Sequence, residues 1–595
     1  MHKYISAYAD KHLDPLSISL KHTVVGVERS NSHWKVTWKT EQDALEQDDF
    51  DFLIVSSGFF RKKYIPEIGG LQSFPGTVMH SSDYHGLDQV RDKRIAIVGD
   101  SFSAIELAGE IAPLAKKVTH IHPRPFYVFP RFMPLRSGHP SSPFVPIDLA
   151  LYWKSKRKSP HEGVFPTQEE LHSKHMFFRT VCGDQGMLAP SLSVAPDRMP
   201  FVAISEHYLN SVRDGSIDLV EGRLQSVKHS TFTMSSGEVI DEAYDVLIMA
   251  TGFRSDLPYF SPETQTKIEY RPQDSHHPFL AHCLTFHPDL PNAAFVGMYR
   301  GPFMGVVMLQ SQWVAEVFSG KRPGPSPDEL AHGLSMEKML RDTIPRPQFP
   351  HSDYVGLLND LAETLDITPS SLWPGRNTDI VIPAQFVADG ESKFDASRLI
   401  QDVEEDLAAA EKGKWVAGAV YSAWQGSWKI TRRLESANLK LPSGDFEGKA
   451  DFTRRLTSDP DAEDSKTEYA YLEQGKLSTD GGMSFDAQRR YRYNYSEEDD
   501  RIDAYFDDSV DKGFFHSLRF LAPGEEAREG GMWAPWVGEA REGWCAMGEH
   551  LCAPDTYVAA YWFHFSGIHL SEWRVTYKVK GPNKDYVSYT TFTRP

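Results

Sequence analysis

Cysteine is scarce in this chain. Its 595 residues include four cysteines, and none of them forms a C-x-x-C pair: Cys182, Cys283, Cys545 and Cys552. This spacing suits neither a zinc site nor a disulfide framework. We therefore expect no metal and reduced, buried thiols, which are typical of a cytoplasmic protein.

Long hydrophobic runs and an excess of basic residues are also lacking. No stretch approaches the length of a membrane span, and the N-terminal segment has no apolar run of the kind found in signal peptides. The formal net charge is −19 and the isoelectric point is about 5.7. A surface this acidic repels phosphate backbones and anionic lipid. We therefore expect neither a nucleic-acid partner nor a membrane-bound protein.

The chain is too long for one hydrophobic core, and its character changes along its length. Up to about residue 325, apolar runs that end at a glycine turn alternate with helical segments, which predicts an α/β fold with a parallel sheet. Residues 125–200 are Pro-rich and have little clear periodicity, and residues 330–410 are mostly helical and polar. From about residue 415, dense aromatics and short alternating strands predict an antiparallel barrel or sandwich.

One strand–turn–helix segment carries the strongest chemical signal. Gly99, Ser101 and Ala104 occupy the three positions of a dinucleotide-binding G-x-G-x-x-G/A turn. Gly99 permits the tight turn, Ala104 lets the helix pack closely on the strand, and the helix N-terminus offers N–H groups to a diphosphate. Because Ser101 replaces the second glycine, a βα turn of some other doubly wound sheet is an equally good interpretation.

A cation follows the next predicted strand. Arg124 stands where an NADP-binding fold places a positive charge for the 2′-phosphate, and no acid ends this strand as an NAD-binding fold would prefer. The alternative is a solvated surface arginine.

Residues 74–84, FPGTVMHSSDY, place Phe74, Gly76, His80 and Tyr84 just before this unit. Alone, His80 is more typical of a hydrogen-bonded structural histidine. Together, the segment resembles the F-x-G-x-x-x-H-x-x-x-Y signature of the flavin-containing monooxygenase family. Residues 250–253 resemble the family's A-T-G-Y/F motif, and residues 291–298 are similar to the segment that closes its FAD domain. The order and spacing of the motifs agree over residues 1 to about 325.

The resemblance implies a two-dinucleotide, Rossmann-like flavoprotein fold that uses FAD and NADPH. In that family, NADPH reduces the flavin, and the reduced flavin transfers one oxygen atom from O2 to a small organic substrate. By resemblance, the residues that hold NADPH and line the junction of the two nucleotide sites are Gly99, Ser101, Ser103, Ala104, Arg124, Thr251 and Gly252. Gly297 would approach the flavin, and His80 and Tyr84 would lie in the linker that couples the domains. The resemblance implies no catalytic triad, and the catalytic residues stay unknown.

One family feature is missing. No G-x-G-x-x-G motif precedes the NADPH segment, so the first βαβ unit of the FAD domain is absent and the fold is incomplete at the N-terminus. The sequence is either an incomplete gene model or a truncated variant. We therefore keep two hypotheses: an NADPH- and FAD-dependent monooxygenase, and a non-oxygenating NADP-binding protein with a ligand-binding barrel. A purely structural protein leaves the paired nucleotide motifs unexplained, and a homo-oligomer stays open.

The C-terminal part resembles an uncharacterised domain with a lipocalin-like, or calycin-type, barrel. Such a barrel can hold one small ligand. Its polar constellation is His516, His550, Cys552, Asp555 and Tyr557. These side chains either line a cavity or satisfy one another's hydrogen bonds at the barrel mouth. The expected domains are a partial FAD domain and linker (1–85), an NADPH domain (86–240), an FAD-domain closing segment (241–330), a helical connection (331–412) and the barrel (413–595).

Overall fold

The computed structural model describes most of the chain. The described residues are 2–30, 32–136, 138–152, 167–301, 303–349, 354–370, 380–388, 390–438, 442–457, 466–507, 513–522 and 542–595. They form two compact units. One contains residues 1–63 and 253–368, and the other contains residues 64–252 and 369–595.

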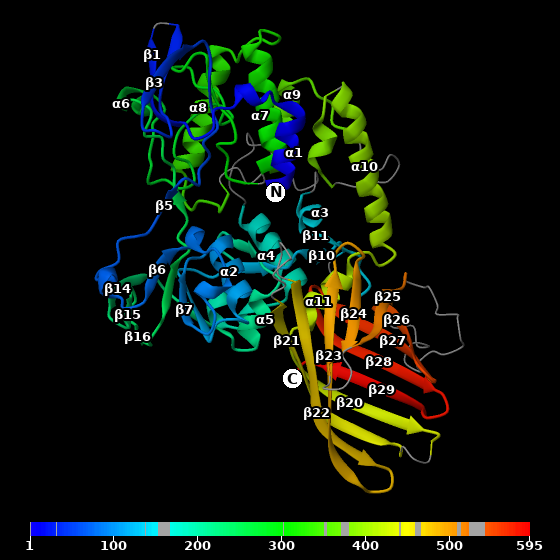
Figure 1. The fold of residues 1–595 in the computed structure, drawn as a ribbon. Coiled ribbons are helices and arrows are strands. Elements are labelled where there is room, and N and C mark those ends of the chain that lie inside the picture. The colour runs from blue at the N-terminus through cyan, green and yellow to red at the C-terminus, as the bar shows by residue number, and fades with distance from the viewer. Residues whose placement is uncertain are drawn as a thin grey trace. The chain divides into compact units, whose positions relative to one another are not determined.

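The second unit is built around a five-stranded parallel sheet, whose strands run from blue to green in Figure 1 with α2 beside it. The strand order is β13-β8-β7-β17-β6, and every neighbouring pair is parallel. The elements of this sheet and its first crossover are β6 (Thr77–His80), β7 (Arg94–Val98), α2 (Phe102–Ile111), β8 (Lys117–His122), β13 (Ile217–Glu221) and β17 (Val246–Met249). β7 and β17 are almost entirely buried. Their uninterrupted apolar sequences follow from this burial on both faces, and the α/β prediction is confirmed.

Other elements surround this sheet. They are β9 (Tyr127–Phe129), β10 (Phe132–Pro134), β11 (Phe144–Pro146), α3 (Ile147–Leu151), α4 (Gln168–Cys182), β12 (Val202–Ile204), α5 (Tyr208–Arg213), β14 (Leu224–Lys228), β15 (Thr231–Met234) and β16 (Val239–Asp241). The sequence analysis predicted no helix at α4, because residues 125–200 have little clear periodicity. In the structure it begins at a capping box between Thr167 and Glu170 and buries Leu171, His175 and Phe178 on one face.

The C-terminal part of the second unit is a closed antiparallel barrel of ten strands. Two helices precede it, α10 (Glu391–Ala410) and α11 (Val416–Trp424). The barrel strands are β20 (Gly426–Ser436), β21 (Gly444–Thr457), β22 (Lys466–Thr479), β23 (Ser484–Ser496), β24 (Arg501–Phe506), β25 (Phe514–Phe520), β26 (Trp544–Cys552), β27 (Asp555–Ser566), β28 (His569–Lys580) and β29 (Asp585–Thr593). The predicted barrel is thus confirmed, with two strands more than the eight of a lipocalin.

Aromatic side chains fill much of the barrel. The apolar face of α11 joins them in one core with residues such as Trp428, Phe452, Tyr493 and Trp573. Trp424 of α11 stacks on Phe452 with ring centroids 5.2 Å apart. Large inward-facing rings are what a barrel of this size needs to fill its interior.

The first unit combines short strands with helices. Its elements are α1 (His2–His12), β1 (Thr23–Ser30), β2 (His33–Lys39), β3 (Leu45–Phe50), β4 (Leu53–Val55), β5 (Lys62–Lys63), β18 (Phe253–Arg254), α6 (Pro262–Lys267), β19 (Ala293–Phe295), α7 (Phe303–Phe318), α8 (Pro327–Asp342) and α9 (Tyr354–Thr364). β1, β2 and β3 form an antiparallel sheet, and β4 pairs with β19 in parallel. Its core includes Trp34, Phe260 and Phe295. No helix among the described residues of the chain is long and apolar enough to cross a membrane.

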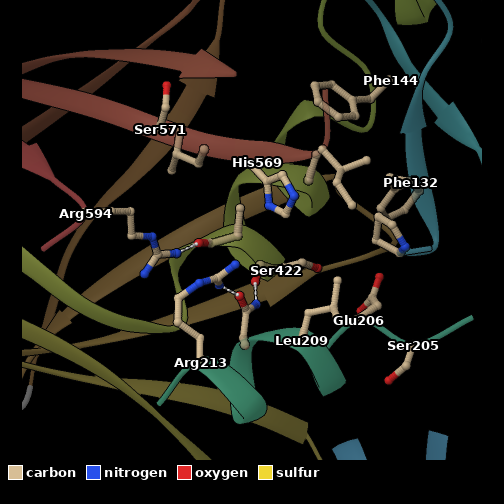
Figure 2. A pocket seen from close by; sticks show the side chains of 16 residues that line it. Phe132, Phe144, Ser205, Glu206, Leu209, Arg213, Ser422, His569, Ser571 and Arg594 are labelled. Atoms are coloured by element: carbon tan, nitrogen blue, oxygen red, sulfur yellow. Dashed lines mark hydrogen bonds between the residues drawn. The ribbon is translucent and has the colours of Figure 1, made fainter. Parts of the chain in front are cut away.

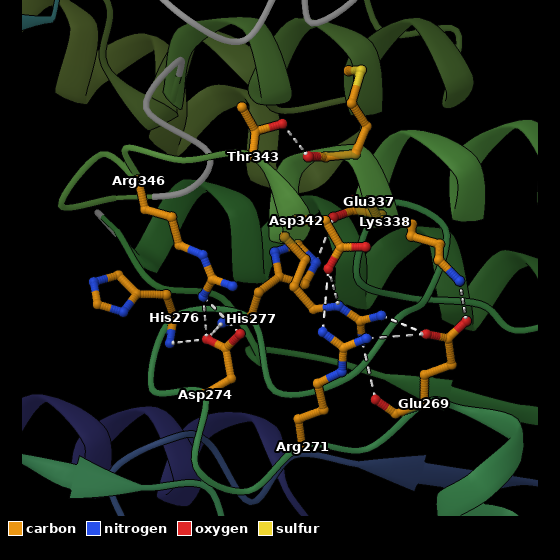
Figure 3. A network of polar contacts seen from close by, with 12 residues as sticks. Glu269, Arg271, Asp274, His276, His277, Glu337, Lys338, Asp342, Thr343 and Arg346 are labelled. Atoms are coloured by element: carbon orange, nitrogen blue, oxygen red, sulfur yellow. Dashed lines mark hydrogen bonds and ion pairs between the residues drawn. The ribbon is translucent and has the colours of Figure 1, made fainter.

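A polar network fastens α8 to the loop after α6 (Figure 3). The fully buried Arg341 donates to the backbone oxygen of Glu269 at 3.0 Å and to its carboxylate at 2.5 Å. Lys338 donates to the same carboxylate at 2.9 Å, and this hydrogen bond is the main reason why the pKa of Glu269 is lowered. Arg346 pairs with Asp274 at 2.6 Å. Because a buried guanidinium is costly unless it is paired, the network holds α8 against the loop after α6.

Candidate functional site

The candidate nucleotide site begins at the turn between β7 and α2, at the carboxyl end of the parallel sheet. Gly99 has φ 155°, and a Cβ atom there would lie 2.3 Å from the backbone oxygen of Ala250 and 3.2 Å from the Cβ of Ala104. Only glycine fits so close to the neighbouring strand. Ala104 is fully buried, so its small side chain lets α2 pack against the turn. The carboxyl edge of such a sheet is where doubly wound folds bind ligands.

Ser101 immediately precedes α2 and replaces the usual second glycine. Its φ of −123° and ψ of 178° are ordinary extended values, so serine causes no backbone strain here. Its side chain caps no N–H group of the helix, and Ser103 in the first turn is exposed. Two hydroxyl groups therefore stand beside the N-terminal end of α2.

Arg124 lies beside this turn. Its Nε is 2.5 Å from a carboxylate oxygen of Asp100, and its guanidinium carbon lies 4.2 Å above the ring centroid of Phe201. The Nη atoms form no hydrogen bond to a residue in the described part of the chain, so four N–H groups stay available to a phosphate. The ion pair and the ring together hold the guanidinium plane in place, which reduces the entropy lost on binding.

Two buried side chains, His120 and Tyr208, support the turn through hydrogen bonds, and the sequence analysis did not predict them. The Nε2 of His120 on β8 donates to the backbone oxygen of Gly99 at 2.7 Å, and its Nδ1 lies 2.5 Å from the hydroxyl of Tyr208 on α5. Both side chains are fully buried. Burial, with a smaller contribution from the neighbouring His122, lowers the pKa of His120 from 6.5 to about 3. The imidazole is therefore neutral at physiological pH and acts as a fixed hydrogen-bonding spacer.

His80 and Gly252 meet where the chain passes between the two units. The buried His80 ends β6, and its Nε2 donates to the backbone oxygen of Gly252 at 2.8 Å. The N–H group of Tyr64 donates to the same oxygen at 2.9 Å, and the Thr251 hydroxyl donates to the backbone oxygen of Tyr64. The sequence assigned His80 to a linker. The structure places it in the sheet, because β6 pairs in parallel with β17.

The other signature residues pack around β6. A Cβ at Gly76 would lie 2.4 Å from the backbone oxygen of Asp245, so the chain needs glycine there. Phe74 is buried against Phe232, with ring centroids 5.9 Å apart. Tyr84 is half-buried, and burial, followed by the charge of Glu110, raises its pKa. Gly297 belongs to the first unit, where it has φ 71° and donates its N–H to the side chain of Gln310 at 3.1 Å.

The structure places the predicted barrel constellation on three successive strands, β25, β26 and β27. His516 is buried, and its Nε2 lies 2.8 Å from the hydroxyl of Tyr561. The rings of His550 and Tyr557 lie near the ring of Phe515, at centroid distances of 5.3 and 5.8 Å.

Tyr557 also has a polar partner, and Asp555 and Cys552 lie at strand ends. The Tyr557 hydroxyl accepts a hydrogen bond from Lys584 at 2.6 Å. The buried Asp555 accepts one from the N–H of Asn583 at 3.0 Å. Cys552 ends β26 next to it, as the partner of Asp555 in the strand pairing. Among the described residues, no group of three or more His, Cys, Asp or Glu side chains is placed to hold a metal ion.

A buried ion pair inside the barrel was not predicted. The two Nη atoms of Arg432 donate to the two carboxylate oxygens of Glu473 at 2.7 Å each, and the Tyr471 hydroxyl donates to the same carboxylate at 2.6 Å. Burial alone would raise the pKa of Glu473, but the charge and hydrogen bonds of Arg432 outweigh it and lower the pKa from 4.5 to about 2. The sequence offers no signal for this pair, because both residues stand in ordinary alternating strands.

Two family models match the chain. Residues 1–374 match "Flavin-binding monooxygenase-like", and residues 424–594 match a family of unknown function, DUF6314. Among curated proteins, 4-hydroxybenzoate brominase (decarboxylating) of Pseudoalteromonas luteoviolacea is 24% identical over 55% of this chain and 61% of its own length. Trimethylamine monooxygenase of Pelagibacter ubique is 34% identical over 18% of this chain and 25% of its own length. The chain thus spans less than two thirds of these relatives.

Solved structures are similar in part. Cyclohexanone monooxygenase from Rhodococcus sp. Phi1, bound to NADP+, is 13% identical, with a TM-score of 0.43 over 61% of this chain and 82% of the other.

Proposed function

The chain belongs to the flavin-binding monooxygenase-like family over residues 1–374, and we propose that it is an NADPH- and FAD-dependent monooxygenase. Its substrates would be O2 and a small organic molecule, with an amine or a sulfide as the oxygen acceptor. The observation that supports this proposal is the turn at Gly99, where the close backbone oxygen of Ala250 requires glycine and the small side chain of Ala104 lets α2 begin right after β7.

The residues around this turn fit NADPH. The N–H groups at the start of α2 and the hydroxyls of Ser101 and Ser103 would bind the diphosphate. Arg124, held by Asp100 and Phe201, would bind the 2′-phosphate through its free Nη atoms. When bound, the nicotinamide supplies the hydride for the reaction.

The fit to FAD is poorer. The whole sequence contains no G-x-G pair, so the full G-x-G-x-x-G motif of an FAD-binding turn is not found in these 595 residues. This observation favours one alternative function: an NADP-binding protein that does not oxygenate, with the barrel as a module for a small ligand.

An absorbance scan of the purified full chain separates the two functions. After incubation with FAD, the monooxygenase would retain a flavin spectrum and oxidise NADPH under air. A colourless protein that still binds NADPH would favour the alternative. A protein that binds neither would refute both.

A matched pair of variants tests the nucleotide site itself. We expect Arg124→Ser to weaken NADPH binding by about 10- to 100-fold, since a charge-assisted contact to phosphate is lost. Removing Arg124 also leaves Asp100 without this ion pair, and the Asp100 charge repels NADPH and NADH alike. The ratio of the dissociation constants of NADPH and NADH therefore reports only the contact with the 2′-phosphate. Arg91→Ser, at an exposed arginine of the same unit, is the control. An unchanged ratio in Arg124→Ser would show that Arg124 does not bind the 2′-phosphate.

A further inference from the structure

A pocket of about 290 Å³ lies inside the second unit, where the parallel-sheet half meets α11 and the barrel (Figure 2). Its walls come from α5, the strands β10 and β11, α11 and the start of β28. The apolar side chains that line it are Pro130, Phe132, Phe144, Leu209, Ala419, Ala423, Ile568 and Leu570. The nucleotide turn is not part of this lining, so the pocket is a separate site.

Two guanidinium groups lie at one side of the pocket, as Figure 2 shows. Arg213 ends α5, and Arg594 follows the last barrel strand. Arg594 stacks on Trp428 at 3.8 Å and donates to the backbone oxygens of Ala423 at 2.5 Å and Gln425 at 2.9 Å. Burial, and then the charge of the nearby Arg213, lower the pKa of Arg594 to about 9. Both groups are therefore cationic at neutral pH.

The positive charge of this pair is not balanced locally. Neither guanidinium forms an ion pair with a carboxylate in the part of the chain that the structure describes. The nearest acid in sequence, Asp214, instead accepts hydrogen bonds from the N–H of Ser216 at 2.9 Å and from Gln425 at 3.3 Å. Glu206, across the pocket, lies 3.5 Å from Arg131. Arg594 is half-buried and Arg213 is exposed, so solvent screens part of the repulsion between the two charges, and an anion bound between them would remove the rest.

Hydrogen bonds join the α5 side of the pocket wall to the α11 side. Asn210 of α5 donates to the backbone oxygen of Ser422 in α11 at 2.9 Å, and Gln425 donates to the hydroxyl of Ser211 at 3.2 Å. Arg213 is itself held by a 2.5 Å hydrogen bond to the Asn210 side chain. A ligand would meet a preformed pocket, which lowers the cost of binding.

We propose that this pocket binds a small organic carboxylate, whose anionic end lies between Arg213 and Arg594 and whose aromatic or aliphatic body lies against Phe132, Leu209 and Ile568. Paired guanidinium groups recognise a carboxylate by charge and by parallel hydrogen bonds. The apolar wall distinguishes such a ligand from an inorganic anion, which has no surface to bury. The site links the parallel-sheet half of the unit to the barrel half.

Isothermal titration of the full chain with sodium benzoate, at constant ionic strength, tests the proposal. We expect binding to the wild type, and binding at least about tenfold weaker in Arg213→Gln, because a charge-assisted contact is lost. Ala423→Leu fills the apolar part of the pocket without changing charge and should weaken binding similarly. Arg490→Gln, at an exposed arginine of the barrel, should bind like the wild type.

Two further probes define the chemistry. Benzamide has the same body without the charge, and inorganic phosphate has charge without the body. Both should bind at least about tenfold more weakly than benzoate, since benzamide lacks the charge and phosphate lacks the apolar surface.

Three results would overturn the proposal: no binding at millimolar benzoate, equal binding to the wild type and both pocket variants, or phosphate binding as tight as benzoate binding. NADPH is absent from these titrations, so their outcome is independent of the nucleotide site.

Discussion

His120 gives the sharpest test of how the nucleotide turn is supported. Its pKa is about 3 in the folded protein and 6.5 in the unfolded chain, so the fold excludes a proton that the unfolded chain accepts. The contribution of the neutral His120 to the free energy of unfolding is complete above pH 6.5, and it is lost progressively as the pH falls towards 3. Between pH 7 and pH 5 the loss from this residue alone is about 2 kcal/mol, at 1.36 kcal/mol per pH unit below 6.5.

The measurement is hydrogen–deuterium exchange of peptides from β7 and α2 at pH 5, 6 and 7, corrected for intrinsic exchange rates. In His120→Gln the side chain does not titrate, so the difference in protection between pH 7 and pH 5 should shrink by about 2 kcal/mol relative to the wild type. His172→Gln, at an exposed histidine of α4, should keep the wild-type dependence. If His120→Gln and the wild type lose the same protection on acidification, the imidazole is not the buried neutral group described above.

Two other perturbations test the turn and the barrel. Gly99→Ala should cost roughly 2–3 kcal/mol and abolish NADP+ binding in a fluorescence titration, since its Cβ would lie 2.3 Å from the oxygen of Ala250. Gly215→Ala, with φ 78° and open space around it, should cost about 1 kcal/mol and leave binding unchanged; equal effects would refute the steric reasoning. Glu473→Gln should cost roughly 3 kcal/mol at pH 7, because the buried Arg432 loses its counter-charge. Since the folded pKa of Glu473 is below its unfolded value, the wild-type advantage should vanish as the pH falls from 4.5 to about 2, as judged by denaturation midpoints. A constant advantage would contradict the ion-pair account.

The sequence was most informative where one local rule decides the structure. The turn at Gly99 could be predicted because a buried strand, a glycine and a helix start follow one another within a few residues. The barrel could be predicted because alternating aromatic strands recur between turn residues. α4 escaped prediction although Leu171, His175 and Phe178 have helical spacing, because a histidine in the stripe weakens the apolar signal. The capping box between Thr167 and Glu170 was a sign that could have revealed it.

Contacts between distant residues could not be predicted. His120 and Tyr208 are separated by 88 positions, and neither stands in a motif. The same holds for Arg213 and Arg594, which meet only because the barrel packs on α5. Such pairs depend on how whole elements pack, and a single sequence carries no record of that packing.

The spacing of the F-x-G-x-x-x-H segment has a structural explanation in the length of β6. Gly76 lies just before the strand, where only glycine tolerates the close backbone oxygen of Asp245. His80 ends the same strand and donates to the oxygen of Gly252. Asp245 immediately precedes β17 and Gly252 lies just beyond it, so the segment fastens both ends of the neighbouring strand.

The oxygen of Gly252 also accepts the N–H of Tyr64, so its two lone pairs are both used. The His80 imidazole thus has its Nε2 proton committed to a backbone oxygen and its Nδ1 turned to the hydroxyl of Ser82 at 2.9 Å. With both ring nitrogens engaged in backbone or hydroxyl contacts, His80 has no free position for proton transfer. The contacts of this segment thus hold the backbone of Tyr64 and Gly252, and the proposed NADPH site remains the turn at Gly99.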